Sequence, residues 1–167
     1  MAKVVFKLGD DISTDVIYPG RYMATVLPTE TPQFAFADYA EFNGPLKARQ
    51  IAPGSVIVAG KNFGCGSSRE QAVSTLKGHE LIIVAESYAR IFLQNAINLG
   101  LNLIVAPGVK ASVGDDLDIG RDRVVNKTTG KSFETVQLPQ ARQAIIDAGG
   151  LIPFTRKRVL EAKASSR

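Results

Sequence analysis

The sequence predicts an α/β protein with a parallel core sheet, flanking helices and short antiparallel strands. Between residues 55 and 106, three short apolar runs alternate with two segments of helical pattern, which is the order typical of a parallel sheet. After Asp115 the pattern changes to short strand-like runs separated by turns. The chain has 167 residues, 45% of them hydrophobic and 22% charged, which favours one domain over residues 1–167.

The first element in order is a strand at Val4–Leu8, where apolar residues recur at short intervals. A polar run from Gly9 to Asp15 follows, and its composition predicts a turn-rich loop. The segment Met23–Thr31 has no clean period and contains Pro28, so we expect a mobile surface loop there. Loops of this kind often carry specificity.

The core elements are expected where apolar runs of strand length alternate with longer helical patterns. Buried strands are expected at Ser55–Ala59, Leu81–Ala85 and Leu103–Ala106, and helices at Arg69–Lys77 and Tyr88–Leu99. The short antiparallel strands are expected at 117–119, 124–125 and 132–134, followed by helices at 140–148 and 154–163.

The chain offers little metal or membrane chemistry of its own. Cys65 is the only cysteine and His79 the only histidine, which excludes an internal disulfide and a Cys/His metal cage within this chain. We therefore expect no metal site here. No run approaches the roughly 20 apolar residues of a membrane span, and the N-terminus lacks a signal-peptide core, so we expect a cytoplasmic protein.

The formal net charge is +4, and basic residues gather near the C-terminus. They are Arg156, Lys157, Arg158, Lys163 and Arg167. No aromatic interleaving or nucleic-acid motif accompanies them, so a solvated tail is favoured over a nucleic-acid or membrane surface. A small acidic substrate fits the positive charge equally well.

The most informative stretch is Asn62–Glu70 (Asn-Phe-Gly-Cys-Gly-Ser-Ser-Arg-Glu), between a predicted strand and a predicted helix. Its glycines, one of them Gly66, allow tight turns close to a ligand, and the N–H groups at a helix start attract anions. Arg69 adds a planar fork suited to a carboxylate. Together with Ser67 and Ser68, these features indicate a carboxylate or phosphate pocket that contains two hydroxyls.

Other interpretations of this stretch stay open on spacing alone. Ser67 with Glu70, or Ser68 with Gln71, fits a capping box that merely begins a helix, and spacing by itself favours that reading. Cys65 at a helix N-terminus has the position of a low-pKa nucleophile, but no base is evident nearby. A dinucleotide fingerprint fails, because its third glycine would fall at Arg69.

Three acidic residues in the first loop could be taken for the ligands of a metal ion. They are Asp10, Asp11 and Asp15. The spacing does not match a calcium-binding loop, so turn formation and capping are favoured instead.

Three blocks of the sequence resemble the small subunits of the isopropylmalate-dehydratase kind within the aconitase family. The blocks are Gly9–Tyr22, Asn62–Glu70 and Ser87–Gly100, in the order and at the separations of that family. The resemblance covers nearly the whole chain. It implies a swivelling β/β/α domain that docks on a separate large subunit carrying a [4Fe-4S] cluster, with no cofactor held by this chain.

The resemblance also implies roles for single residues. Ser67 would act as the base that removes a proton next to a carboxylate. Ser68, Arg69 and Gly66 would contact the substrate, with the Arg69 guanidinium on its carboxylate. The partner's cluster iron would take the departing hydroxyl as a Lewis acid. One departure is Gln71, which stands where the family often has histidine.

Substrate preference is expected to depend on a short loop formed by Tyr22, Met23, Ala24 and Thr25. Related homoaconitase subunits resemble Tyr-Leu-Arg-Thr here, with an arginine that faces a third carboxylate. Ala24 offers no charge to pair it, and an unpaired buried charge is costly. We therefore expect an alkyl-substituted malate, above all the interconversion of 3- and 2-isopropylmalate in leucine biosynthesis. Dimethylmalate, citramalate and homoaconitate remain alternatives.

Two other classes of function stay open. A stand-alone, anion-binding regulatory domain would keep the fold but have no large cluster-bearing partner. A nucleic-acid-binding protein would show strongly salt-dependent association with RNA through its basic tail.

Overall fold

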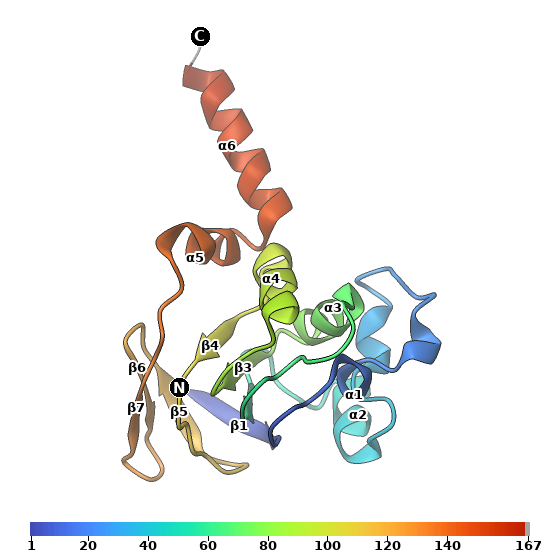
Figure 1. Cartoon of the computed structure of the whole chain (residues 1–167), viewed down its shortest axis with the longest axis vertical. Coiled ribbons are helices and arrows are strands. Elements are labelled where there is room, and N and C mark those ends of the chain that lie inside the picture. Colours follow the sequence, from blue (N-terminus) through green and yellow to red (C-terminus); the bar gives the residue numbers. More distant parts are fainter. Residues whose placement is uncertain (166–167) are drawn as a thin grey trace.

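A seven-stranded sheet in the order β4-β3-β2-β1-β5-β6-β7 runs through the computed structural model, which describes residues 1–165 (Figure 1). The parallel strands are β1 (Ala2–Lys7), β2 (Val56–Ala59), β3 (Ile82–Ala85) and β4 (Leu103–Val105). The antiparallel strands are β5 (Asp116–Ile119), β6 (Arg123–Asn126) and β7 (Ser132–Glu134). The predicted fold class is confirmed.

The central parallel strands β2 and β3 are buried on both faces, which explains their unbroken apolar sequence. All four residues of β2 are buried, and they point alternately to two core clusters. Ile57 packs in the cluster that contains Val73 and Phe92 of the helices. Val58 packs on the opposite face, with Leu117 from the antiparallel strands. The antiparallel strands therefore cover the face of the parallel sheet that the helices leave open.

Three helices on the core lie close to their predicted positions. They are α3 (Glu70–Gly78), α4 (Arg90–Leu99) and α5 (Gln140–Asp147). Helix α4 packs on the core through Phe92 and Ala96, which are buried, whereas its Ile91 is 45% exposed.

Several short elements lie where the sequence gave no helical signal. They are α1 (Thr14–Ile17), η1 (Gly20–Tyr22), η2 (Thr31–Phe34) and α2 (Ala40–Lys47). The loop expected at residues 9–15 thus ends in the first turn of α1. Ser13 is the N-cap of this helix, and its hydroxyl accepts a hydrogen bond from Val16 N.

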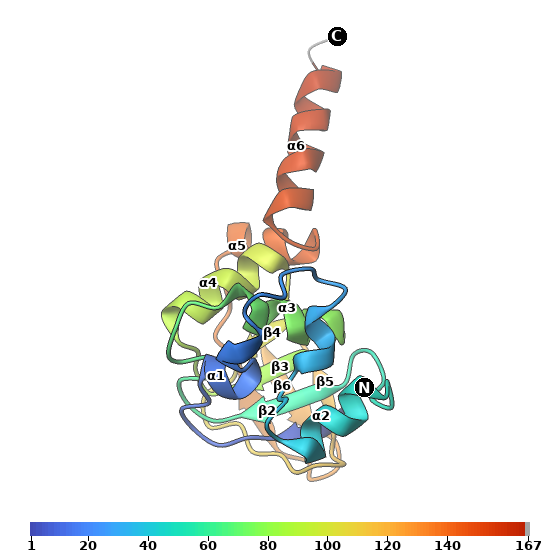
Figure 2. The same ribbon diagram turned by 90° about the vertical axis from the view of Figure 1, so that its right-hand side faces the viewer.

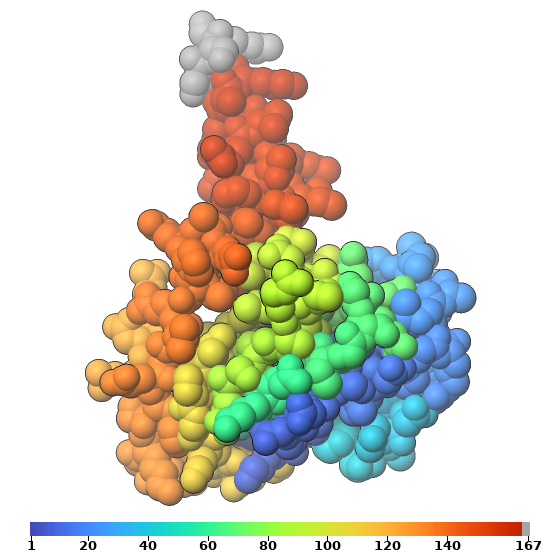
Figure 3. All heavy atoms as spheres, in the orientation of Figure 1, coloured from blue at the N-terminus to red at the C-terminus, as the bar shows by residue number. Residues whose placement is uncertain are grey.

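The last helix, α6 (Leu151–Ser165), extends away from the rest of the chain (Figures 1 and 2). It begins three residues earlier than expected, with Pro153 in its first turn, where a missing N–H costs nothing. The basic residues 156–158 and Lys163 are exposed on it, and Figure 3 shows the helix standing clear of the molecular surface. Arg167 lies outside the described residues. Within residues 1–165, no helix is both long and apolar enough to cross a membrane.

Candidate functional site

The loop 62–69 follows β2 and is held on one side by the loop that precedes α1. Gly64 N donates to Ile12 O at 2.7 Å, and Thr14 N donates to Cys65 O at 2.8 Å. The Thr14 hydroxyl also donates to Ser67 O at 2.9 Å. These bonds fix the backbone of the serine loop up to Ser67.

On its other side the same loop is bound to the segment that leads into α4. Phe63 N donates to Ser87 O at 3.0 Å, and Ala89 N donates to Phe63 O at 2.9 Å. Asn62 N donates to the Ser87 hydroxyl at 2.9 Å. The three sequence blocks that carried the family resemblance therefore lie side by side in space.

Glycine is required at two points of this loop. Gly64 has φ +81, and a Cβ atom there would lie 2.1 Å from Cγ of Phe92. Gly66 has φ +92, a left-handed conformation that other residues adopt only with strain. The backbone consequently passes close to α4 and then turns outward at the two serines.

Ser67 and Ser68 do not cap the following helix. Helix α3 begins at Glu70 and its N-cap is Arg69, which makes no side-chain capping bond. The capping-box interpretation is therefore wrong, because both serines precede the N-cap position that a box requires. Both serines are exposed, and in the described part of the chain neither hydroxyl has a hydrogen-bond partner.

Arg69 is held in one orientation beneath this loop. Its guanidinium forms an ion pair with Asp15, and Nη1 donates to Tyr18 O at 3.2 Å. The Arg69 side chain is only 14% exposed. A Cβ atom on Gly20 would lie 3.3 Å from Nη2, so a bare backbone leaves room for the guanidinium. Arg69 has five N–H donors in all, so donors remain for a ligand.

The sequence missed this role of Asp15, because the two partners stand 54 residues apart. The other two acidic residues bind loop groups, as a turn role predicts: Asp10 Oδ1 accepts from Lys61 N and Asp11 Oδ1 from Asn62 Nδ2, both at 2.7 Å.

Cys65 Sγ donates to the backbone oxygen of Asp11 at 3.3 Å. Over residues 1–165, no three His, Cys, Asp or Glu side chains gather in a way that could hold a metal ion.

The loop formed by residues 22–25 is tied to the same region by side chains. The Tyr18 hydroxyl donates to Tyr22 O at 3.1 Å and to Thr25 O at 3.4 Å. Burial raises the pKa of Tyr18, which keeps this hydroxyl protonated as a donor. Gln71 Nε2 donates to Met23 O at 3.3 Å, and Ala24 is exposed at the tip.

Thus Gln71, which the sequence left without a role, joins this loop to the first turn of α3. Because Tyr18 also accepts from Arg69, the loop and the arginine share one anchor. The structure thereby brings together the predicted serine, arginine and specificity-loop residues on one surface, which is open because its serines are exposed.

Known proteins resemble this chain along most of its length. The model of the aconitase C-terminal domain matches residues 17–106. An isopropylmalate/citramalate isomerase small subunit from Methanocaldococcus jannaschii is 42% identical over 164 residues, covering 95% of each chain. A 3-isopropylmalate dehydratase small subunit from Thermodesulfovibrio yellowstonii is 41% identical over 160 residues, covering 93% of each chain.

Among solved structures, a crystal structure of 3-isopropylmalate dehydratase from Methanocaldococcus jannaschii superposes with a TM-score of 0.85. It is 36% identical, and the match covers 98% of this chain and 97% of the other. The chain belongs to the aconitase C-terminal domain family. Within that family it is similar, over almost its full length, to the small subunits of 3-isopropylmalate dehydratase.

Proposed function

We propose that this chain is the small subunit of a two-chain hydro-lyase that isomerises an alkyl-substituted malate, most notably 3- and 2-isopropylmalate in leucine biosynthesis. The observation that carries the proposal is the pairing of two free serine hydroxyls with an oriented arginine at the start of α3. Similarity along nearly the whole chain to small subunits named for isopropylmalate, one of them also for citramalate, supports it. The single-domain organisation over residues 1–167 and a cytoplasmic location remain predictions.

In the proposed mechanism Ser67 removes the proton from the carbon next to a substrate carboxylate. A serine hydroxyl is a weak base in water, so its alkoxide needs stabilisation. The free N–H groups at the N-terminus of α3 and the fixed positive charge of Arg69 supply it. Ser68 adds a hydrogen bond, and Gly66 lets the backbone approach the substrate closely.

Arg69 binds the substrate carboxylate with the donors that Asp15 and Tyr18 leave unused. The ion pair with Asp15 positions the guanidinium before substrate arrives, so little side-chain entropy is lost on binding. Asp15 is thus a positioning residue in this proposal.

The donor set of this chain does not fit an iron–sulfur cluster. Cys65 is its only thiol and bonds to the Asp11 carbonyl, and residues 1–165 hold no cluster of three ligands. We therefore assign the [4Fe-4S] cluster implied by the family resemblance to a large partner subunit. There it would act as a Lewis acid toward the substrate hydroxyl.

The preference for an alkyl substituent rests on Ala24. Its exposed methyl group, on a loop anchored beside Arg69, provides no partner for a third carboxylate. A small side chain leaves room for isopropyl without requiring it, so citramalate and dimethylmalate are expected as secondary substrates.

Reconstitution tests the proposal. The chain is co-expressed with its cognate large subunit, purified anaerobically and assayed with isopropylmalate, citramalate, dimethylmalate and homoaconitate. Co-purification of the large subunit and fastest turnover of an alkylmalate are expected. A chain that purifies alone and binds anions without turnover would instead be a regulatory anion-binding domain.

A further inference from the structure

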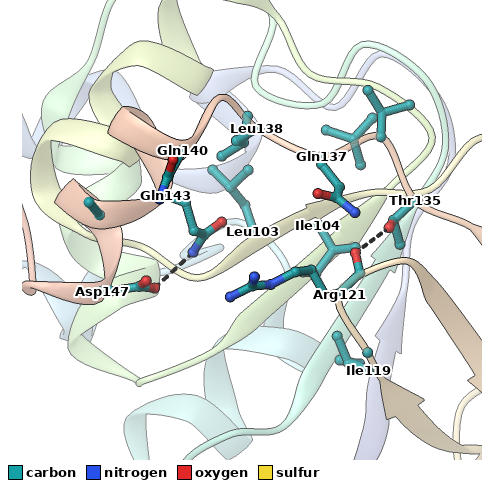
Figure 4. A pocket seen from close by; sticks show the side chains of 14 residues that line it. Leu103, Ile104, Ile119, Arg121, Thr135, Gln137, Leu138, Gln140, Gln143 and Asp147 are labelled. Carbon is teal, nitrogen blue, oxygen red and sulfur yellow. Dashed lines mark hydrogen bonds between the residues drawn. The ribbon is translucent and has the colours of Figure 1, made fainter.

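A cavity of about 640 Å³ lies at the seam where the two edges of the sheet approach each other. At the end of β4, one antiparallel bridge joins the edges, in which Val136 N donates to Val105 O at 2.8 Å. The chain then leaves toward α5, so the ladder does not continue. Helix α5 covers the gap without filling it, and a cavity therefore remains between the strands and the helix (Figure 4).

The floor of the cavity is apolar and connects both core clusters. Leu103 and Leu138 belong to the cluster beneath the helices. Ile104 and Ile119 pack against the cluster on the opposite face. The volume falls within the range of about 300–1,000 Å³ that is typical of small-molecule sites, which commonly combine apolar walls with a few polar groups.

One wall carries a positive charge without a partner. Arg121 lies in the turn between β5 and β6, and its backbone oxygen accepts from the Thr135 hydroxyl at 2.7 Å. Figure 4 shows its side chain extending across the cavity toward Gln143 and Asp147. As far as the described residues go, its guanidinium has no carboxylate or carbonyl partner. Its planar donors are therefore available to a ligand carboxylate.

The opposite wall carries acceptors on α5. Gln143 Nε2 donates to Asp147 Oδ1 at 2.8 Å, which fixes both side chains one helical turn apart. The amide oxygen of Gln143 and the second carboxylate oxygen of Asp147 remain as acceptors. Donors on one wall, acceptors on the other and an apolar floor suit a small molecule with a carboxylate, a donor group and a hydrocarbon tail.

We propose that this cavity binds a small α-amino or α-hydroxy acid with an apolar side chain. Arg121 binds the carboxylate, Asp147 and Gln143 accept from the ammonium or hydroxyl group, and the tail packs on Leu103 and Leu138. The site is separate from Ser67, because none of the cavity-lining residues belongs to the serine loop, α1 or α3, and α4 lies between α5 and α3 (Figure 1).

Calorimetric titration of the purified full-length chain tests the proposal. The probes are leucine, its α-hydroxy analogue 2-hydroxyisocaproate, alanine, and isoamylamine, which lacks the carboxylate. Saturable binding of leucine or the hydroxy acid is expected, with weaker binding of alanine and none of isoamylamine. Tighter binding of leucine than of the hydroxy acid would assign the donor as an ammonium facing Asp147. Tighter binding of the hydroxy acid would assign it as a hydroxyl.

Variants distinguish this site from unspecific binding. Arg121→Gln is expected to weaken binding at least about tenfold, because a charge-assisted contact is lost. Arg142→Gln changes an exposed arginine on α5 outside the cavity and should bind as wild type does. Ala144→Leu should fill the hollow and abolish binding, with thermal unfolding used to verify that it folds. Absence of saturable binding by both acids, or equal binding by Arg121→Gln and wild type, would overturn the proposal.

Discussion

Two loops meet at the proposed active site, and they are held in different ways. The serine loop, residues 62–69, is fixed mainly by hydrogen bonds between backbone atoms of three chain segments, with the Thr14 and Ser87 hydroxyls adding one bond each. The loop 22–25 is fixed by two side chains, Tyr18 and Gln71, which bond to its carbonyl oxygens. Backbone hydrogen bonds survive most substitutions, whereas a hydrogen bond made by a side chain is lost when that one residue is replaced. The proposed catalytic serine thus lies on a loop held mainly by backbone bonds, whereas the proposed specificity loop is joined to the rest of the protein by side chains that single substitutions can remove.

The largest expected effect is on turnover. Ser67→Ala should lower kcat of the reconstituted enzyme about 10²- to 10⁴-fold, which is the contribution of a general base. Fold and subunit association should persist, because the exposed hydroxyl has no structural partner within residues 1–165. Ser68→Ala is the matched control and should cost less. Ordinary turnover by Ser67→Ala would remove the base assignment.

Gly64→Ala should break the framework of the serine loop itself. The new methyl group would overlap the Phe92 ring and force a left-handed alanine, at a cost of about 3 kcal/mol. Thermal unfolding should shift down by roughly 10 °C. Gly130→Ala is the control, because it has φ +74 with open space around it and measures backbone strain alone. Equal shifts for both variants would show that the contact with Phe92 is unimportant.

Arg69→Lys should raise KM for an alkylmalate roughly tenfold, since a point charge cannot replace a bidentate fork. Asp15→Asn should raise KM less, because the arginine remains but loses its charged anchor. Steady-state kinetics measure both. Arg123→Lys, on the exposed surface of β6, serves as the control. An unchanged KM in Arg69→Lys would make Arg69 a structural residue only.

Much of this arrangement was predictable from local composition, and the parts that were missed leave little signal in any one stretch of sequence. Strands such as β2 and β3 are continuous apolar runs, so their positions follow from local composition. The serine motif also stood out as a glycine-rich turn before a helix. The ion pair of Asp15 with Arg69 did not, because it joins residues far apart in sequence. Helix α1 was missed because four residues are too few to show a period.

The side-chain tethers of the loop 22–25 should affect substrate choice more than rate. Ala24→Arg is expected to raise relative activity on homoaconitate about tenfold, because it supplies a partner for a third carboxylate. Adding Tyr18→Phe, which removes two anchoring bonds, should reduce that gain. Ala24→Gln controls for side-chain length. If Ala24→Arg and Ala24→Gln share the wild-type substrate ranking, the loop does not reach the substrate.

The smallest expected effect concerns pH. Burial lowers the pKa of His79 below its ordinary value of 6.5, while its Nε2–H donates to Pro32 O at 2.8 Å. The unfolded chain therefore binds the proton more readily. The free energy of unfolding therefore keeps the full contribution of the neutral imidazole above pH 6.5 and loses it as pH falls through the lower folded-state pKa. The free energy of unfolding, measured with a denaturant at a series of pH values below 6.5, should fall with pH in wild type and fall less in His79→Gln. Parallel curves would contradict the assignment.

The central claim is that the open surface around Ser67 becomes an active site only when a partner covers it. The most direct measurement is the initial rate of alkylmalate dehydration as this chain is titrated into a fixed amount of its large subunit, both kept anaerobic. We predict no turnover by either chain alone and a rate that rises to saturation as the complex forms. Turnover by this chain alone, or a rate set by the large subunit and unaffected by adding this chain, would contradict the account.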